Sequence, residues 1–375
     1  MKYKDIVELK KRMEFKMTEP ETLVKLVTDA QNKGENVRRD MERLRNIASK
    51  LTKIFTENGL IFTETALKDL KLKYKRAVGI DGSFQLVGGA GGKWYVPLSI
   101  ARIIFDNGLG TQPRVDVFWA SIEELDEVEE YNLNRSATMM MLAFETEAIF
   151  NWGTLNKEAY VFIDGPIVDP PVIGYEDKDY IKTRCNAIKK CLETSIVVGC
   201  VKRSRDKFYI NHLRSLTSEG IEKEYPTQFP SDQYLIAHIF SQIRSKGYYG
   251  PLFTRWIDIS STPISNDTYE AYKEEGVHIV CLFFQKDVRS QVLRIDIPFL
   301  QPPSEDVAKV DAEVMHIVKA VNEWTYPGQD YPVPVFLAHN KCNIREGCAE
   351  ILYEEIMTRS RTTDQSDQII LSWLR

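Results

Sequence analysis

The sequence predicts a mixed α/β fold that contains an antiparallel section and begins with a helical segment. Three observations lead to this class. Residues 1–72 carry mainly helical patterns. Strand-like runs with the spacing of antiparallel strands follow between residues 77 and 120. Strands then alternate with helices up to about residue 360, an order typical of α+β and mixed α/β proteins.

The composition is that of a globular protein with a substantial core. Apolar residues make up 43% of the 375 positions and charged residues 27%, which is unlike a disordered chain. No apolar run has the length needed to span a bilayer, and the charged N-terminus lacks the apolar core of a signal peptide. We therefore expect a cytoplasmic protein without a membrane partner, built as one large domain or two ordinary ones.

Charge and cysteine content exclude some classes of function. The net charge of −5 argues against a generally basic nucleic-acid coat, although a local groove on an acidic protein can be positive. Two basic runs, at residues 68–76 and 202–207, are each interpreted as a solvated face. The six cysteines form no CxxC pair, so we expect reduced, buried thiols and not a zinc or redox motif.

Residues 1–75 are predicted to form a helical arm. Apolar residues recur at three- and four-residue spacing in segments 4–15 and 21–32, and Pro20 marks a break between them. Residues 34–55 continue with mixed charges and an intermittent apolar stripe. Such a stripe fits an arm or hairpin that packs on a neighbour, for example on a second subunit.

Residues 76–360 are expected to form the main domain. Its first strand is expected to begin at residue 77 and to end at Asp81, and further strands are predicted at residues 84–88, 94–105 and 114–120. The glycine-rich stretch at residues 88–92 is a turn and not a phosphate loop, because Trp94 stands where such a loop needs Ser or Thr. The later elements are helices at residues 133–152, 180–192, 307–324 and 344–360, strands at 160–164 and 195–202, and a hairpin of 276–285 with 290–297.

Two segments do not fit this pattern. Residues 204–270 show no clear period and are interpreted as an insertion into the main domain. Residues 361–375 begin with a polar stretch and are interpreted as a C-terminal tail.

Two apolar, strand-like runs end in Asp-Gly, at Asp81 and at Asp164. Because both runs are apolar on successive residues, they fit strands that are buried on both faces of a sheet. A carboxylate at the end of such a strand lies at the sheet edge, and the following glycine lets the backbone turn away. Two such carboxylates on neighbouring strands would bind Mg²⁺ or Mn²⁺ against a phosphate. The simpler alternative is that each Asp-Gly pair only makes a turn.

A third carboxylate ligand is expected from the helix predicted at residues 133–152. The neighbours of Glu145 one helical turn away are all apolar, and a carboxylate on such a buried stripe needs a cation or a hydrogen-bond partner. Glu147 is the competitor, but it lies closer to the polar edge of the helix because Asn151 follows one turn later. We prefer Glu145 and keep Glu147 as the alternative.

Three further side chains are candidates for the chemistry. Lys202 follows an apolar strand and could reach a phosphate or the attacking water, although a lysine at a strand end is often only solvated. In residues 331–340, two prolines favour extended backbone, so His339 is expected at a loop or a helix entry. His339 would then bind a phosphate or assist the leaving group, and Tyr331 would donate its hydroxyl.

Taken in chain order, these elements resemble the NurA nuclease family. The motifs are Asp-Gly-Ser at residues 81–83, a helix glutamate, Asp-Gly-Pro at 164–166, a strand-end lysine, and a tyrosine followed eight residues later by a histidine. The resemblance covers about residues 77–345. It departs from the family where Gly-Pro follows Asp164, since Gly-Ser is commoner at that point.

The resemblance implies a fold, a site and partners. The fold is an RNase H-like sheet related to the PIWI domain of Argonaute, mixed in strand direction and flanked by helices. The metal carboxylates fall on Asp81, Glu145 and Asp164. The family lysine, tyrosine and histidine fall on Lys202, Tyr331 and His339 as further catalytic residues. The partners are DNA, both single strands and duplex ends, a second copy of the chain, and a hexameric ATPase of the HerA type.

The activity that the resemblance implies is a Mn²⁺-favoured 5′–3′ exonuclease and single-strand endonuclease that processes DNA ends, with Mg²⁺ as the other metal to consider. Two ions about 3.5–4 Å apart would clamp the scissile phosphate in such an enzyme. Two alternatives remain open. One is another RNase H-like endonuclease, such as a junction resolvase or a defence nuclease. The other is a non-catalytic adaptor that binds DNA or the ATPase only.

Overall fold

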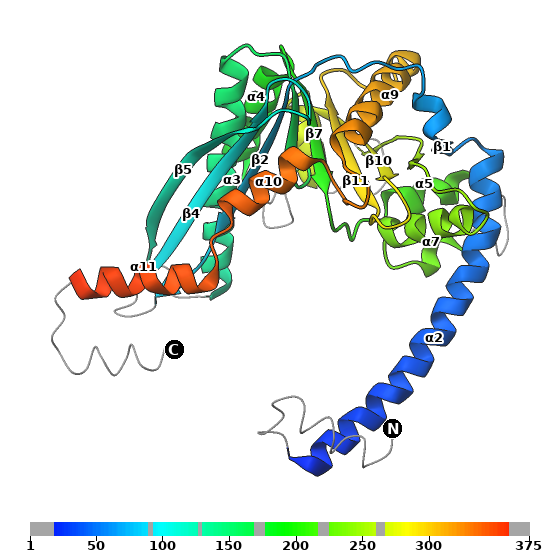
Figure 1. The fold of residues 1–375 in the computed structure, drawn as a ribbon, viewed down its shortest axis with the longest axis horizontal. Coiled ribbons are helices and arrows are strands. Elements are labelled where there is room, and N and C mark those ends of the chain that lie inside the picture. The colour runs from blue at the N-terminus through cyan, green and yellow to red at the C-terminus, as the bar shows by residue number, and fades with distance from the viewer. Residues whose placement is uncertain are drawn as a thin grey trace.

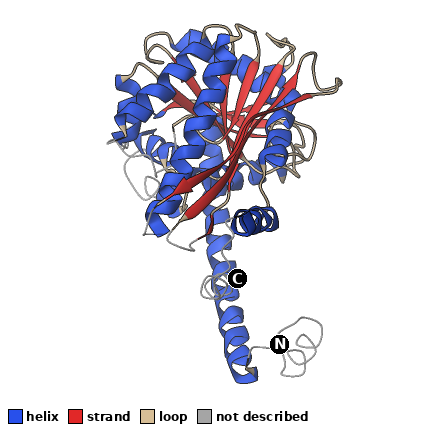
Figure 2. Ribbon diagram, turned by 90° about the vertical axis from the view of Figure 1, so that its left-hand side faces the viewer, coloured by secondary structure: helices blue, strands red, loops and turns tan. Residues whose placement is uncertain are grey.

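The computed structural model describes residues 19–88, 93–126, 130–168, 177–216, 225–259 and 267–359. A mixed sheet of 11 strands forms its centre, and helices cover both faces of that sheet (Figures 1 and 2). The predicted class, a mixed sheet flanked by helices, is therefore confirmed. The helix expected at residues 4–15, most of the turn at 88–92 and the tail at 361–375 lie outside the described residues.

The N-terminal extension is one continuous helix, α2 (Pro20–Glu57). It begins where the sequence indicated a break, because the Glu19 carboxylate accepts the backbone N–H groups of the first turn and Pro20 needs no such partner. The last third of α2 packs into the core through residues such as Leu51 and Phe55. The rest of the helix extends away from the body (Figures 1 and 2).

The helical interpretation is wrong for the segment just after α2. Residues Ile61–Thr63 form strand β1, which pairs antiparallel with β8 (Leu252–Thr254). The only helix between there and residue 76 is the short 3₁₀ turn η1 (Glu64–Leu67). Three residues carry too little periodicity to reveal a strand, so this element depends on its tertiary partner.

The strand order of the sheet is β1-β8-β10-β11-β7-β6-β2-β4-β3, with β5 beside β4 and β9 beside β10. Strands β2, β6 and β7 pair in parallel, and the remaining pairings are antiparallel. The bounds of the other strands are β2 (Ala77–Phe84), β3 (Val87–Gly88), β4 (Trp94–Phe105), β5 (Arg114–Leu125), β6 (Tyr160–Asp164), β7 (Ile196–Val201), β9 (Ile257–Asp258), β10 (His278–Gln285) and β11 (Leu293–Phe299).

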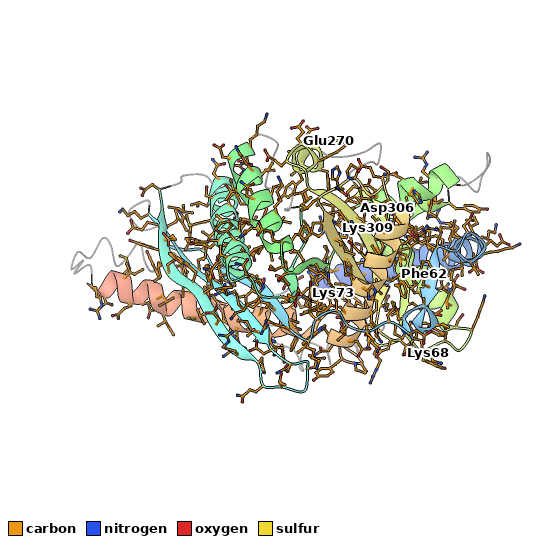
Figure 3. All side chains as sticks on the ribbon, turned by 90° about the horizontal axis from the view of Figure 1, so that it is seen from above. Phe62, Lys68, Lys73, Glu270, Asp306 and Lys309 are labelled. Atoms are coloured by element: carbon orange, nitrogen blue, oxygen red, sulfur yellow. The ribbon has the colours of Figure 1, made fainter. Side chains whose placement is uncertain are left out.

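Each face of the sheet has its own apolar core and its own helices. One core is closed by the end of α2 together with α3 (Glu130–Thr154), α4 (Lys178–Leu192), α5 (Phe208–Leu216), α7 (Asp232–Arg244) and α8 (Asp267–Glu274). The other core is closed by α9 (Val307–Trp324) and α10 (Val333–Cys342). Viewed from above, α9 lies over the sheet with Asp306 and Lys309 near its start (Figure 3). The Asp306 side chain caps this helix by accepting the Lys309 N–H group.

The segment predicted to be an insertion contains helices and two strands of the sheet. Residues 204–259 contribute α5, the 3₁₀ turn η3 (Pro226–Gln228), α7, β8 and β9, and β8 lies within the sheet between β1 and β10. Helix α11 (Glu346–Arg359) contacts β3 and β4.

All six cysteines are free, and five are buried as predicted, whereas Cys348 is exposed. Among the described residues, no helix combines the length and apolarity required to cross a membrane.

Candidate metal centre

The candidate site lies beside the central parallel strands β2 and β6. The parallel pairing of β2 with β6 ends at Ile80 and Ile163, so Asp81 and Asp164 are the next residue of each strand. The expectation that Asp81 ends its strand is wrong, because β2 continues to Phe84 through its antiparallel pairing with β4. The predicted sharp turn occurs only after Asp164, where Gly165 has a φ of 128°.

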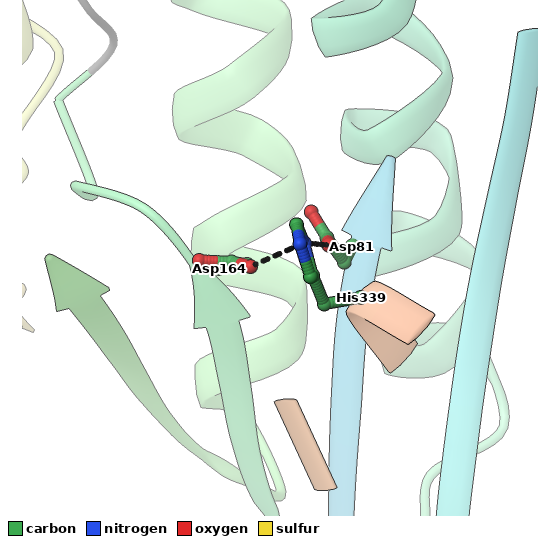
Figure 4. A group of neighbouring side chains, drawn as sticks. All are labelled: Asp81, Asp164 and His339. Carbon is green, nitrogen blue, oxygen red and sulfur yellow. Dashed lines mark hydrogen bonds and ion pairs between the residues drawn. The ribbon is translucent and has the colours of Figure 1, made fainter. Parts of the chain in front are cut away.

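Asp81 and Asp164 point to the same face of the sheet. Side chains alternate between the two faces along a strand. Ala77 and Phe162, which lie an even number of residues before Asp81 and Asp164, both belong to the core on the α10 side. The two aspartates therefore project toward α10. The side chain of His339, a residue of α10, lies between them (Figure 4).

These three side chains form a compact group of possible metal ligands. The Nδ1 atom of His339 lies 2.8 Å from Oδ2 of Asp81 and 3.4 Å from Oδ2 of Asp164. One ligand atom from each residue lies within 4.8 Å of the other two. The Asp81 and Asp164 side chains are only 7% and 11% exposed, whereas that of His339 is 47% exposed. The group is therefore buried on the side of the strands and open to solvent at His339.

The electrostatics of the group favour a bound cation. Burial, followed by the negative charge of Asp81, raises the pKa of Asp164 to about 6, and nearby Lys202 opposes this rise. A hydrogen bond to Asp81 raises the pKa of His339 despite its partial burial. Carboxylate oxygens and an imidazole nitrogen suit Mn²⁺, and carboxylates also suit Mg²⁺. The donor set of the site thus fits the metal that the sequence predicted.

Lys202 and Tyr331 join the group as expected, but with contacts that the sequence did not indicate. The Lys202 ammonium lies 2.5 Å from Oδ2 of Asp164 and 4.1 Å from the centre of the Tyr331 ring. Burial favours the neutral amine, yet the Asp164 carboxylate outweighs it and the pKa of Lys202 is raised. Tyr331 contacts Lys202 through its ring face, which is a cation–π contact. Donation by the Tyr331 hydroxyl during the reaction stays a prediction.

The prediction of extended backbone before His339 is wrong. Residues Val333–Cys342 form α10, and His339 lies in its last turn. Pro332 is the N-cap and Pro334 lies in the first turn, where a proline is tolerated because the N–H groups there have no partner within the helix. The prolines thus mark the start of a helix and not an extended segment.

A glycine that the sequence analysis did not single out determines how α10 sits on the sheet. A Cβ atom on Gly79 would lie 2.1 Å from the carbonyl carbon and oxygen of Pro334 and 2.5 Å from the backbone nitrogen of Val335. No side chain fits at that point, so Gly79 permits direct backbone contact between β2 and α10. A glycine inside a strand pattern is the sequence signal for such an approach.

Glu145 reaches the site from the opposite face of the sheet. Its side chain is almost completely buried, and its Oε1 lies 2.9 Å from where a Cβ atom on Gly82 would be. Glu147 is exposed on the same helix, so the geometry favours Glu145 of the two. Glu145 is nevertheless absent from the three-residue ligand group, in which His339 takes the place that the sequence analysis gave to a third carboxylate.

Two other supporting residues were missed from the sequence. The thiol of buried Cys342 donates a hydrogen bond to Asp81 Oδ2 at 3.4 Å, and burial and the Asp81 charge raise its pKa well above the usual range. Asp296 on β11 accepts the N–H group of Ile167 at 3.4 Å, which anchors the loop after Asp164. Neither contact has a local signal, because the partners are far apart in the chain.

The family model of the NurA domain matches residues 19–344 of this chain. The crystal structure of the NurA nuclease from Sulfolobus solfataricus is similar in fold, with a TM-score of 0.56 and 12% sequence identity over 92% of this chain and 98% of that one. A second NurA crystal structure has a TM-score of 0.45 and 10% identity, covering 93% of this chain and 98% of that one. The structure of endonuclease V of Ciona intestinalis in complex with an inosine-containing DNA has a TM-score of 0.32 and 12% identity, and the match covers 84% of this chain and 99% of that one. Both of these last two TM-scores are below 0.5, so neither likeness supports a conclusion about this chain. No curated protein matches the chain.

Proposed function

Because this chain belongs to the NurA family, we propose that it is a metal-dependent DNA nuclease. The observation that carries the proposal is the group formed by Asp81, Asp164 and His339, which gathers one buried and one partly buried carboxylate and an imidazole from distant parts of the chain. Buried negative charge of this kind is costly without a cation.

Asp81, Asp164 and His339 would hold Mn²⁺ or Mg²⁺, with Glu145 as a further acidic group beside them. A divalent ion bound there would supply the positive charge that activates water and stabilises the phosphate. Lys202 would neutralise negative charge that develops on the phosphate. Its ammonium lies against Asp164 at the candidate metal centre, which supports this role. The Tyr331 ring would help to hold Lys202 in this orientation, since it lies 4.1 Å from the ammonium.

The finer features of the activity rest on the family resemblance. We propose 5′–3′ exonuclease and single-strand endonuclease activity, two divalent ions, preferably Mn²⁺, and a role in DNA-end processing. We also propose a homodimer that works with a HerA-type hexameric ATPase in the cytoplasm. The exposed first two thirds of α2 support a role of the helical arm in assembly, because Leu26 and Val37 are 58% and 59% exposed there.

The direct test is cleavage of end-labelled single-stranded and duplex DNA in Mn²⁺ by the Asp81→Asn variant. This variant should fold normally and lose cleavage, because it removes one metal-binding charge without changing the volume of the side chain. Asp69→Asn is the matched control, since Asp69 is exposed and lies at the start of the segment that leads to β2. Cleavage by Asp81→Asn at the wild-type rate would contradict the proposal.

The alternatives are separated by other measurements. A junction resolvase should prefer four-way junctions to free ends, whereas the proposed enzyme should cut free ends and single strands. A non-catalytic adaptor should show no Mn²⁺ binding that depends on Asp81 and Asp164 in a calorimetric titration. Wild-type protein that binds Mn²⁺ through both residues would exclude the adaptor.

A further inference from the structure

The segment that follows β7, residues 203–207, alternates between anchored and exposed side chains. Ser204 is buried and Asp206 is partly buried, whereas Arg203, Arg205 and Lys207 are exposed. The segment begins directly after Lys202, which contacts Asp164 of the candidate metal centre. The sequence suggested that the basic run at residues 202–207 was only a solvated face. Its first residue, Lys202, instead contacts the candidate metal centre.

Contacts from two other elements, α7 and β11, fix the anchored residues. The Ser204 N–H group donates to the side chain of Gln233 at 2.9 Å. Asp206 accepts a charged hydrogen bond from Arg294, a β11 residue that is 1% exposed. The carbonyl oxygen of Asp206 also accepts the N–H group of Asp232, at the start of α7, at 2.9 Å. A segment held at several points in this way presents its remaining side chains in a defined place.

Arg203, Arg205 and Lys207 form no ion pair or hydrogen bond through their side chains within the described parts of the chain. The two polar residues between these cations have other partners. Asp206 pairs with Arg294, and Ser204 Oγ donates a hydrogen bond to Asp206 at 3.0 Å. Three positive charges that follow Lys202 in the chain are thus left without a side-chain partner among the described residues. On a chain with a net charge of −5, this concentration is a local exception.

A groove begins at Lys202 and Arg203, the first residues after β7. The groove has a volume of about 390 Å³, and Lys202, Arg203, Gln233, Ser290 and Gln291 are among the residues that line it. Lys202 therefore borders both the groove and Asp164. A volume of this size lies within the range of sites that hold a small ligand.

We propose that this groove and the exposed cations of residues 203–207 bind the phosphate backbone of single-stranded DNA on one side of the scissile bond. The inference rests on the proposed nuclease function, which it extends by assigning the path of the strand. Continuity with Lys202 and the charge complementarity of three unpaired cations with successive phosphates support it. Lys202 acts at the metal centre, whereas Arg203, Arg205 and Lys207 position the strand.

The test compares two triple variants in an Asp81→Asn background, where cleavage does not interfere with binding. The first changes Arg203, Arg205 and Lys207 to Ala. The matched control changes Lys71, Lys73 and Lys75 to Ala, which removes the same charge from exposed residues that precede β2, at the end of the strands opposite to Asp81. Affinity for a fluorescent single-stranded oligonucleotide is measured by anisotropy at several salt concentrations.

The first variant should bind the oligonucleotide at least about 10-fold more weakly, and its slope of log affinity against log salt should be about 2 smaller, as three lost phosphate contacts predict. The control should keep most of the affinity and the wild-type slope. Equal losses in the two variants, or an unchanged slope in the first, would overturn the proposed path.

A parallel measurement with intact Asp81 separates this inference from the proposed function. In Mn²⁺, the first triple variant should raise the KM for a long single strand and leave kcat unchanged, because the strand is bound less well but cut by the same groups. If the wild type does not cut DNA while the first variant still loses affinity selectively, the nuclease proposal fails and the strand path stands. If the wild type cuts DNA and the first variant behaves like the control, only the strand path fails.

Discussion

The Nδ1 atom of His339 lies 2.8 Å from Oδ2 of Asp81, although 258 positions separate the two residues in the chain. This contact requires α10 to lie directly on β2. The backbone of Pro334 approaches Gly79 so closely that a Cβ atom there would lie 2.1 Å from it. The geometry of the candidate metal centre therefore depends on a glycine that has no chemical role.

Gly79→Ala should lower the free energy of unfolding by about 2 kcal/mol or more, because the added methyl group must displace the backbone of α10. The same displacement should move His339 and weaken Mn²⁺ binding. Denaturant unfolding and Mn²⁺ calorimetry measure the two effects. Gly110→Ala is the control, since nothing lies within 4 Å of a Cβ atom at that position. Equal stability of the two variants would show that α10 does not press on β2 as described.

Glu145→Gln should reduce the rate of DNA cleavage by about two orders of magnitude, the scale expected when one charged group of a catalytic site is removed. Glu147→Gln should have almost no effect, because that side chain is exposed two residues further along the same helix. Single-turnover cleavage in Mn²⁺ compares the two isosteric changes. A larger loss in Glu147→Gln would reverse the assignment.

Tyr331→Phe should cleave DNA within about 3-fold of the wild-type rate, and Tyr331→Ala should be about 10-fold slower, because a partly buried cation–π contact is worth about 1.4 kcal/mol. The reason is that the ring face, and not the hydroxyl, lies 4.1 Å from the Lys202 ammonium. A loss in Tyr331→Phe as large as that in Tyr331→Ala would instead assign the function to the hydroxyl group.

The raised pKa of Asp164 predicts how the stability of the metal-free protein depends on pH. The folded-state pKa of about 6 exceeds the ordinary value of 3.8, so the folded protein binds a proton that the unfolded chain releases between these values. The stabilising contribution is complete below about pH 3.8 and is lost as pH rises through about 6. Relative to Asp164→Asn, the wild type should lose up to about 3 kcal/mol between pH 4 and 7.

Denaturant unfolding with a metal chelator, at each pH, checks this difference. Added Mn²⁺ should reverse the trend, because the metal binds the ionised carboxylate and competes with the proton. If the difference in the free energy of unfolding between wild type and Asp164→Asn stays constant from pH 4 to 7 without metal, the raised pKa of Asp164 is contradicted.

Regular periodic segments could be predicted from the sequence alone. The strand β4 (Trp94–Phe105) and the helix α9 (Val307–Trp324) have the bounds that their patterns predicted. Each carries its pattern over enough residues for the period to be unambiguous. The same is true of the order of the motifs, which indicated the family correctly.

Features that depend on tertiary contacts could not be predicted in this way. The two prolines of α10 indicated extended chain, because the sequence does not show that the helix docks on Gly79. Asp81 looked like a strand end, because the pairing of β2 with β4 that extends the strand is not local. The ligand group was expected to contain three carboxylates, and only the fold shows that His339, and not Glu145, lies between Asp81 and Asp164.

The central claim is that Asp81, Asp164 and His339 together bind a divalent cation. Crystals soaked in Mn²⁺ and measured near the manganese absorption edge test it most directly. We expect an anomalous difference peak in contact with all three side chains, and no such peak in crystals of Asp81→Asn. Wild-type crystals in which Mn²⁺ binds elsewhere, or leaves these three residues without a peak at saturating concentration, would contradict the account.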